Sequence, residues 1–177
     1  MSVVILIMVS IFIARILSPL FHELGHAIIG LMTFKKSIHV YLGSYGDQSQ
    51  SYSFSFGRLH LNFTYNPALW IKGVCMTDEE EITWSQDFLF TIGGLIASLL
   101  VALICITYTF LSSSDSWLLI PIFFLGISGL LDFILSIFPS NNLERLDNGE
   151  KIENDGQQLK ILYQQKKLYH QIEKFQN

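Results

Sequence analysis

The sequence has few charged residues, few cysteines and no basic cluster, and each shortage narrows the class of protein. Only 15% of the 177 residues are charged, whereas 50% are hydrophobic and 14% are aromatic. This composition is typical of an integral membrane protein, so we expect the lipid bilayer as a partner. The two cysteines, Cys75 and Cys105, are too few for a disulfide framework. No stretch interleaves basic and aromatic residues, so we expect no nucleic-acid partner.

Three apolar runs occupy residues 3–34, 85–111 and 117–138, and we predict that each forms a transmembrane helix. A helix needs about 20 residues to cross the hydrocarbon core of a bilayer. The first run is longer than one straight span, so we expect its helix to tilt or to kink at Pro19. The chain length suits one domain. We therefore predict an α-helical membrane protein in which residues 1–177 form a single membrane-embedded domain.

Residues 37–76, between the first two spans, carry a different pattern. Apolar and polar side chains alternate in 38–42, 52–56 and 59–63, which is typical of half-buried strands. We predict a small membrane-associated β-sheet of two or three strands here. A strand edge within 51–63 could accept an extended peptide as an added strand. The alternative is a structural hairpin that only packs at the membrane surface.

The tail, residues 140–177, begins as a polar segment and then becomes amphipathic. We predict a C-terminal amphipathic helix over 157–175, whose apolar stripe comprises Leu159, Leu162, Leu168, Ile172 and Phe175. Its lysines exclude a further membrane span, so we expect this helix to lie on the membrane or against the sheet.

The distribution of lysine and arginine predicts how the chain crosses the membrane. The loop between the second and third spans contains no lysine or arginine, whereas the first loop and the tail contain most of them. Positively charged loops remain cytoplasmic. We therefore predict a multi-pass protein of the cell membrane, with the N-terminus outside and both the β-rich loop and the tail in the cytoplasm.

The first apolar run contains a motif with metal-binding spacing, His22-Glu23-Leu24-Gly25-His26. Residues four apart lie on one face of a helix, so His22 and His26 could share a metal ion. Glu23 would lie at the flank of the same site and could take a proton from the attacking water. Ionisable residues within apolar segments are costly and usually functional. We predict a zinc site with Glu23 as the catalytic base.

Catalytic zinc usually has three protein ligands, so the motif leaves one to be found. Asp155, Asp132 and Asp147 are the candidates on the basis of their surroundings. Asp155 comes just before the predicted tail helix, where it could instead serve as a helix cap. Asp132 lies within the third span and needs a partner there.

Arg15 lies two helical turns before His22, on the same face of the first span. It could reach towards the membrane surface or face a polar cavity. The alternative is a supporting role at the site, such as stabilising an oxyanion. We favour the first interpretation.

The sequence resembles the site-2 proteases, the M50 family of intramembrane zinc metallopeptidases. The stretch 21–27 (Phe-His-Glu-Leu-Gly-His-Ala) is similar to the family's zinc motif, and 92–98 (Ile-Gly-Gly-Leu-Ile-Ala-Ser) resembles its second motif without the usual proline. The stretches 136–139 and 154–156 resemble the elements that supply the third ligand, with Ser136 in place of asparagine. The resemblance implies zinc bound by His22, His26 and Asp155, and the catalytic base Glu23.

The resemblance implies hydrolysis of peptide bonds in or near the membrane-spanning segment of a substrate protein. The substrate must be locally extended, because a helix keeps its carbonyl groups in internal hydrogen bonds. Two other functions remain open: a protease-like membrane protein that binds a partner without cutting it, and a membrane metal-binding protein. The first does not need Glu23, and the second would favour more ligands along the spans.

Overall fold

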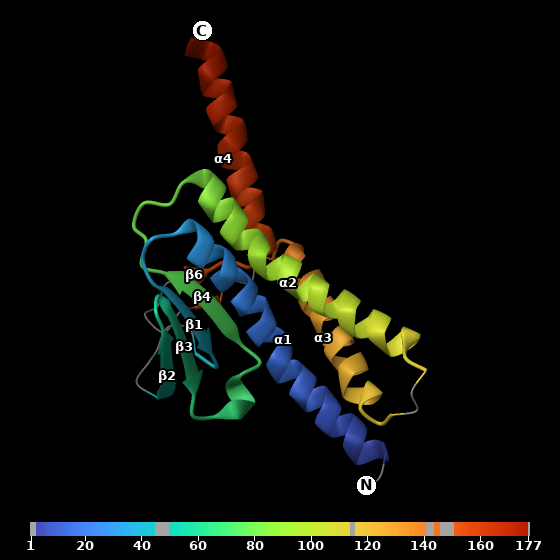
Figure 1. The fold of residues 1–177 in the computed structure, drawn as a ribbon. Helices are drawn as coiled ribbons and strands as arrows, with labels where there is room; N and C mark the ends of the chain where they lie inside the picture. Colours follow the sequence, from blue (N-terminus) through green and yellow to red (C-terminus); the bar gives the residue numbers. More distant parts are fainter. Residues whose placement is uncertain (1–2, 45–49, 114–115, 141–143, 146–150, 177) are drawn as a thin grey trace.

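The computed structural model describes residues 3–44, 50–113, 116–140, 144–145 and 151–176. Three long helices, α1 (Val3–Thr33), α2 (Trp84–Leu111) and α3 (Leu119–Ile137), form a bundle (Figure 1). Their bounds agree with the predicted apolar runs to within two residues. All three are long and apolar enough to cross a membrane. Helix α1 continues through Pro19, which lies inside it.

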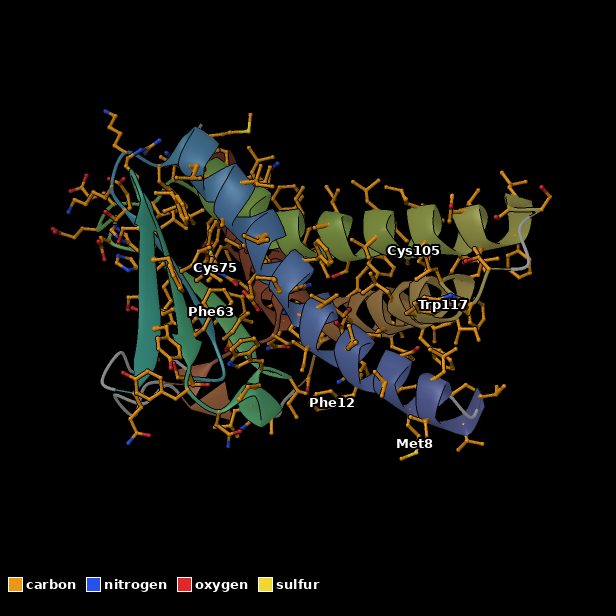
Figure 2. All side chains as sticks on the ribbon, turned by 60° about the horizontal axis from the view of Figure 1, so that its bottom comes forward. Met8, Phe12, Phe63, Cys75, Cys105 and Trp117 are labelled. Atoms are coloured by element: carbon orange, nitrogen blue, oxygen red, sulfur yellow. The ribbon has the colours of Figure 1, made fainter. Side chains whose placement is uncertain are left out.

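The bundle buries small side chains between its helices and exposes large apolar ones. Alanine, glycine and serine make up most of the buried helical positions, for example Ala14, Ser18, Ser98, Ala102 and Ser128. Met8 and Phe12 are 66% and 53% exposed on the outer side of α1 (Figure 2). Small residues at helix contacts with large apolar residues facing outwards are the arrangement expected for helices in lipid.

A mixed four-stranded sheet lies against α1, where two or three strands were predicted. It comprises β1 (Ile38–Leu42), β2 (Ser51–Phe56), β3 (Leu59–Thr64) and β4 (Gly73–Thr77), in the order β2-β3-β1-β4. Strand β1 is parallel to β3 and antiparallel to β4. The prediction missed β4 because its residues are all half-buried, and Gly-Val-Cys-Met-Thr shows no alternation.

The core of the molecule lies between α1 and one face of the sheet. Ile38 and Val40 of β1 pack against Ala27 of α1 and against Phe34, which follows α1 directly. Helix α1 contacts β1 and β4 on one side and α2 and α3 on the other, so it stands between the sheet and the rest of the bundle (Figure 1). The histidine motif therefore lies where all these elements meet.

The tail contains a short strand pair, β5 (Glu144–Arg145) with β6 (Lys151–Ile152), followed by helix α4 (Asp155–Gln176). Helix α4 starts two residues earlier than predicted, and it packs against α2 and α3. The indole N–H of Trp84 donates to the Leu162 carbonyl, and the Lys166 ammonium lies 4.3 Å from the Trp84 ring centroid. Beyond this contact α4 projects away from the bundle (Figure 1), so the prediction that it lies against the sheet is wrong.

Candidate metal centre

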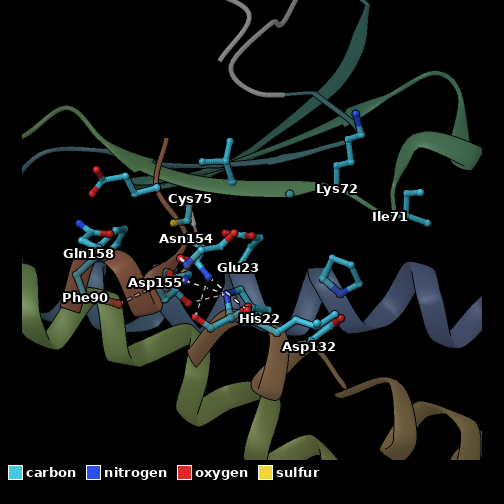
Figure 3. Close-up of a pocket in the computed structure, with 18 residues that line it drawn as sticks. His22, Glu23, Ile71, Lys72, Cys75, Phe90, Asp132, Asn154, Asp155 and Gln158 are labelled. Atoms are coloured by element: carbon cyan, nitrogen blue, oxygen red, sulfur yellow. Dashed lines mark hydrogen bonds and ion pairs between the residues drawn. The ribbon is translucent and has the colours of Figure 1, made fainter. Parts of the chain in front are cut away.

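His22 and His26 lie one turn apart on α1, and both side chains are buried. Their Nε2 atoms are 3.2 Å apart. Asp155, the first residue of α4, brings its carboxylate to the same point. Its Oδ2 lies 3.0 Å from His22 Nε2 and its Oδ1 lies 3.5 Å from His26 Nε2. Among the described residues, these three form a group whose ligand atoms lie within 4.8 Å of one another (Figure 3).

The opposite nitrogen of each imidazole has its own hydrogen-bond partner. His26 Nδ1 lies 2.7 Å from the Phe90 carbonyl oxygen, and His22 Nδ1 lies 2.9 Å from Ser98 Oγ. A carbonyl oxygen only accepts, so His26 Nδ1 carries a proton, and a neutral ring then has its lone pair on Nε2. Partners of this kind fix the tautomer and orientation of metal-binding histidines.

The three groups could together hold a metal ion, because each offers one ligand atom to the same point. In a tetrahedral zinc site, ligand atoms about 2.0–2.1 Å from the ion are about 3.3 Å from one another. The observed separations of 3.0, 3.2 and 3.5 Å bracket this value. Two imidazoles and a carboxylate also suit a transition metal such as zinc.

Glycine makes room for this arrangement on α2. A Cβ atom built on Gly94 would overlap with the imidazole of His26. The glycine pair Gly93-Gly94 therefore lets α2 approach α1 and leaves room for the imidazole of His26. Any larger residue at position 94 would displace this ring.

The Asp155 carboxylate is ionised in this setting. Burial alone would raise its pKa, but the positive charge of His26 and the interactions with His22 lower the pKa below its ordinary value. The alternative role of Asp155 as a helix cap does not hold, because Asn154 takes it. The side-chain oxygen of Asn154 accepts from the backbone N–H of Gln157 at 3.1 Å.

Glu23 is buried beside the histidines, outside the group of three ligand candidates. Its side chain packs against β4, where a Cβ atom built on Gly73 would lie 2.7 Å from Glu23 Cγ. Glu23, His22, His26 and Asp155 line one cavity of about 580 Å³. In Figure 3 the strand that carries Cys75 passes above this cluster. The position of Glu23 at the flank of the site is therefore as predicted.

Asp132, one of the other ligand candidates, lines the same cavity but pairs with Arg15. Arg15 Nη1 lies 3.2 Å from Asp132 Oδ1, which gives Asp132 the partner that its place in an apolar helix demands. This pair, in which Arg15 contacts an aspartate on α3, was not predicted from the sequence. The two residues are 117 positions apart, so the sequence alone gave no sign of the contact. Asp147 lies outside the described residues.

The predicted strand edge within 51–63 is that of β2, and whether it accepts a peptide stays a prediction. Strand β2 does not line the cavity. The other edge strand, β4, lines the cavity through Gly73, Val74 and Cys75.

Sequence reasoning missed Ser98 and the Phe90 carbonyl as partners of the histidines. The only available signal was the general requirement that Nδ1 of a ligand histidine needs a partner. Ser98 belongs to the stretch 92–98 that resembles the second family motif, and nothing in that motif indicates a contact with His22.

The structure is thus an apolar three-helix bundle in which two buried histidines meet a half-buried aspartate beside a buried glutamate. A search of protein families, of curated protein sequences and of solved structures found no match for the chain.

Proposed function

We propose that this chain is a membrane-embedded zinc metalloprotease that hydrolyses peptide bonds in or near the membrane-spanning segment of a substrate protein. The observation that carries the proposal is the convergence of Asp155 with His22 and His26, beside Glu23, in one cavity. These groups come from both ends of the chain, and together they offer three ligand atoms and a neighbouring carboxylate. The resemblance to site-2 proteases points the same way.

His22, His26 and Asp155 line the cavity and would hold the zinc ion there. A bound zinc ion supplies Lewis acidity, which lowers the pKa of water towards neutrality and polarises a carbonyl group. Ser98 and the Phe90 carbonyl orient the two imidazoles.

Glu23 accepts the proton of the attacking water and then donates it to the leaving amine. Its carboxylate lies beside the ligands without joining them, which is the position that a base requires.

The substrate enters as an extended segment beside β4. An edge strand offers backbone groups to a peptide that has left its own helix, and this compensates for the helical hydrogen bonds that the peptide has lost.

The protein would lie in the cell membrane with the N-terminus outside and the tail in the cytoplasm. A reporter fused after Asn177 should read cytoplasmic and one inserted near Ser113 external, and the opposite pattern would reverse this orientation.

The decisive experiment compares the purified protein with its Glu23→Gln variant for zinc content and for cleavage of co-expressed candidate membrane substrates. Glu23→Gln should keep the zinc and lose about 10²–10⁴-fold in cleavage rate, because the base is removed and the ligands stay. The matched control is Glu81→Gln, an exposed acid in the segment before α2, which should change neither quantity.

Two outcomes would contradict the proposal. Zinc without cleavage in the wild type would favour a protease-like binding protein. Equal cleavage by wild type and Glu23→Gln would remove the assigned base.

A further inference from the structure

The side chain of Asn154, the neighbour of Asp155, joins two helix ends. Its Nδ2 lies 2.7 Å from the Phe138 carbonyl oxygen, and 3.3 and 3.4 Å from those of Leu135 and Ser136. Its Oδ1 accepts from the backbone N–H groups of Gln157 and Ser140, both at 3.1 Å. One planar amide therefore contacts the end of α3 and the first turn of α4 together.

The end of α3 needs such a donor. The last carbonyl groups of a helix have no partner within the helix. The Leu135 carbonyl would normally accept from the residue four positions later, but that residue is Pro139, which has no N–H. The N–H of Ser140, the regular partner of Ser136, is bound to Asn154. The side-chain amide of Asn154 thus donates to carbonyl groups at the end of α3 that lack their regular backbone donors.

The start of α4 needs an acceptor, and the same side chain provides it. The first N–H groups of a helix point outwards, and asparagine is among the best residues to accept from them. Serine and aspartate cap equally well, but neither carries two further hydrogens for the carbonyl groups of α3. Asparagine alone meets both requirements with one group of fixed geometry.

The two helix ends are also in direct contact next to Asp155. A Cβ atom built on Gly156 would overlap with the carbonyl of Ile137. Asp155 thus lies between a residue that is hydrogen-bonded to α3 and a residue that touches α3. With the end of α3 and the start of α4 in this joint, the Asp155 carboxylate lies 3.0 Å from His22 Nε2 and 3.5 Å from His26 Nε2.

We infer that Asn154 is a positioning residue for the metal centre: it fastens α4 to α3 and so holds Asp155 against the two histidines. The inference rests on the proposed function as far as the metal is concerned. It concerns a residue that touches neither metal nor substrate, and it explains how a tail helix can supply a ligand to a site inside the bundle.

The test uses the full-length protein and Co²⁺ as a spectroscopic probe. Asn154→Ser keeps a neutral cap but removes the donor to α3. It should weaken Co²⁺ binding about 10–100-fold, as the loss of groups that orient ligands does. Its absorption spectrum should shift towards that of Asp155→Ala, which a merely loosened fold would not produce. Asn66→Ser, at the cap of the short helix Pro67–Leu69, is the matched control and should leave both unchanged.

A second readout does not depend on metal. Amide hydrogen exchange at Gln157 and Gln158 in the metal-free protein should be faster in Asn154→Ser than in the wild type. If Asn154→Ser does not fold, Asn154→Asp serves the same purpose, because it caps but cannot donate. Wild-type Co²⁺ affinity and spectrum in these variants would overturn the inference. If the wild type binds no Co²⁺, the proposed function fails. In that case, unchanged amide exchange at Gln157 and Gln158 in Asn154→Ser would also show that Asn154 does not hold α4 to α3.

Discussion

The histidines and the aspartate of the candidate metal centre are placed by two different kinds of structure. His22 and His26 need only one regular helix, because four residues along α1 bring their rings to one face. Asp155 needs a joint between α3 and α4, the docking of α4 on α2, and room for its approach. The histidine pair is therefore placed by local helix geometry, whereas the aspartate is placed by contacts between distant elements. Mutations far from the cavity should disturb the aspartate more than the histidines.

Removal of one of the three proposed metal ligands should weaken zinc binding more than any other change, whether the residue is a histidine or the aspartate. His22→Ala and Asp155→Ala should each weaken zinc binding by more than about 100-fold, because ligands matter more than the groups that orient them. Asp155→Asn keeps the shape but loses the charge, and it should behave like Asp155→Ala. Metal titration measures this, with the surface variant Asp78→Asn as control.

Full zinc binding and full activity in Asp155→Asn would show that the carboxylate is no ligand. Asp132, which lines the same cavity, would then become the leading candidate.

A side chain at position 94 should disturb the histidine pair on α1. The added methyl of Gly94→Ala overlaps with the His26 ring, and overpacking of this kind typically costs about 1–3 kcal/mol. We expect weaker zinc binding by about one to two orders of magnitude. Gly57→Ala is the control: its Cβ atom meets open space, and the positive φ of 61° makes it cost stability without touching His26, so zinc binding should not change. Unchanged affinity would mean that the ring is free to move and that the site is less rigid than described.

Removal of the Ser98 hydroxyl should loosen one histidine and spare the other. Ser98→Ala deprives His22 Nδ1 of its partner and should weaken zinc binding about 10-fold, whereas His26 keeps the Phe90 carbonyl. Ser98→Thr retains a hydroxyl and should recover part of the loss. Equal binding by all three proteins would show that helix packing alone orients His22.

The contact between α4 and α2 should give the smallest effect. Trp84→Phe keeps an aromatic ring but loses the N–H that donates to the Leu162 carbonyl. A hydrogen bond of this kind contributes about 1 kcal/mol, which corresponds to about fivefold in zinc affinity if docking and binding are coupled. The same change in Trp117→Phe, in the segment before α3, should have no effect. Equal losses in both variants would show that α4 docking is not coupled to the site.

The sequence predicted the local features well, because they depend on runs and spacings. The three apolar helices agree with their predicted ranges, and α1 presents the two histidines together as the spacing required. Asp155 was one of three candidates by its surroundings, and only the family resemblance singled it out; its place beside the histidines involves the end of α3. Whether it binds metal stays a prediction.

Other features depend on contacts between distant residues, which no local pattern encodes. Arg15 and Asp132 were each recognised as unusual in an apolar helix, but their pairing requires the packing of α1 on α3. Asn154 was missed because asparagine before a helix indicates only a cap. Its second role exists only where Pro139 leaves carbonyl groups without donors.

The central claim is that His22, His26 and Asp155 bind one metal ion together. X-ray absorption spectroscopy of the zinc-loaded, full-length protein tests it most directly. The account predicts one zinc per chain with two imidazole nitrogens and carboxylate oxygen at about 2.0–2.2 Å. A spectrum with sulfur at about 2.3 Å, as Cys75 in the cavity wall would give, or with fewer than two imidazoles, would contradict it.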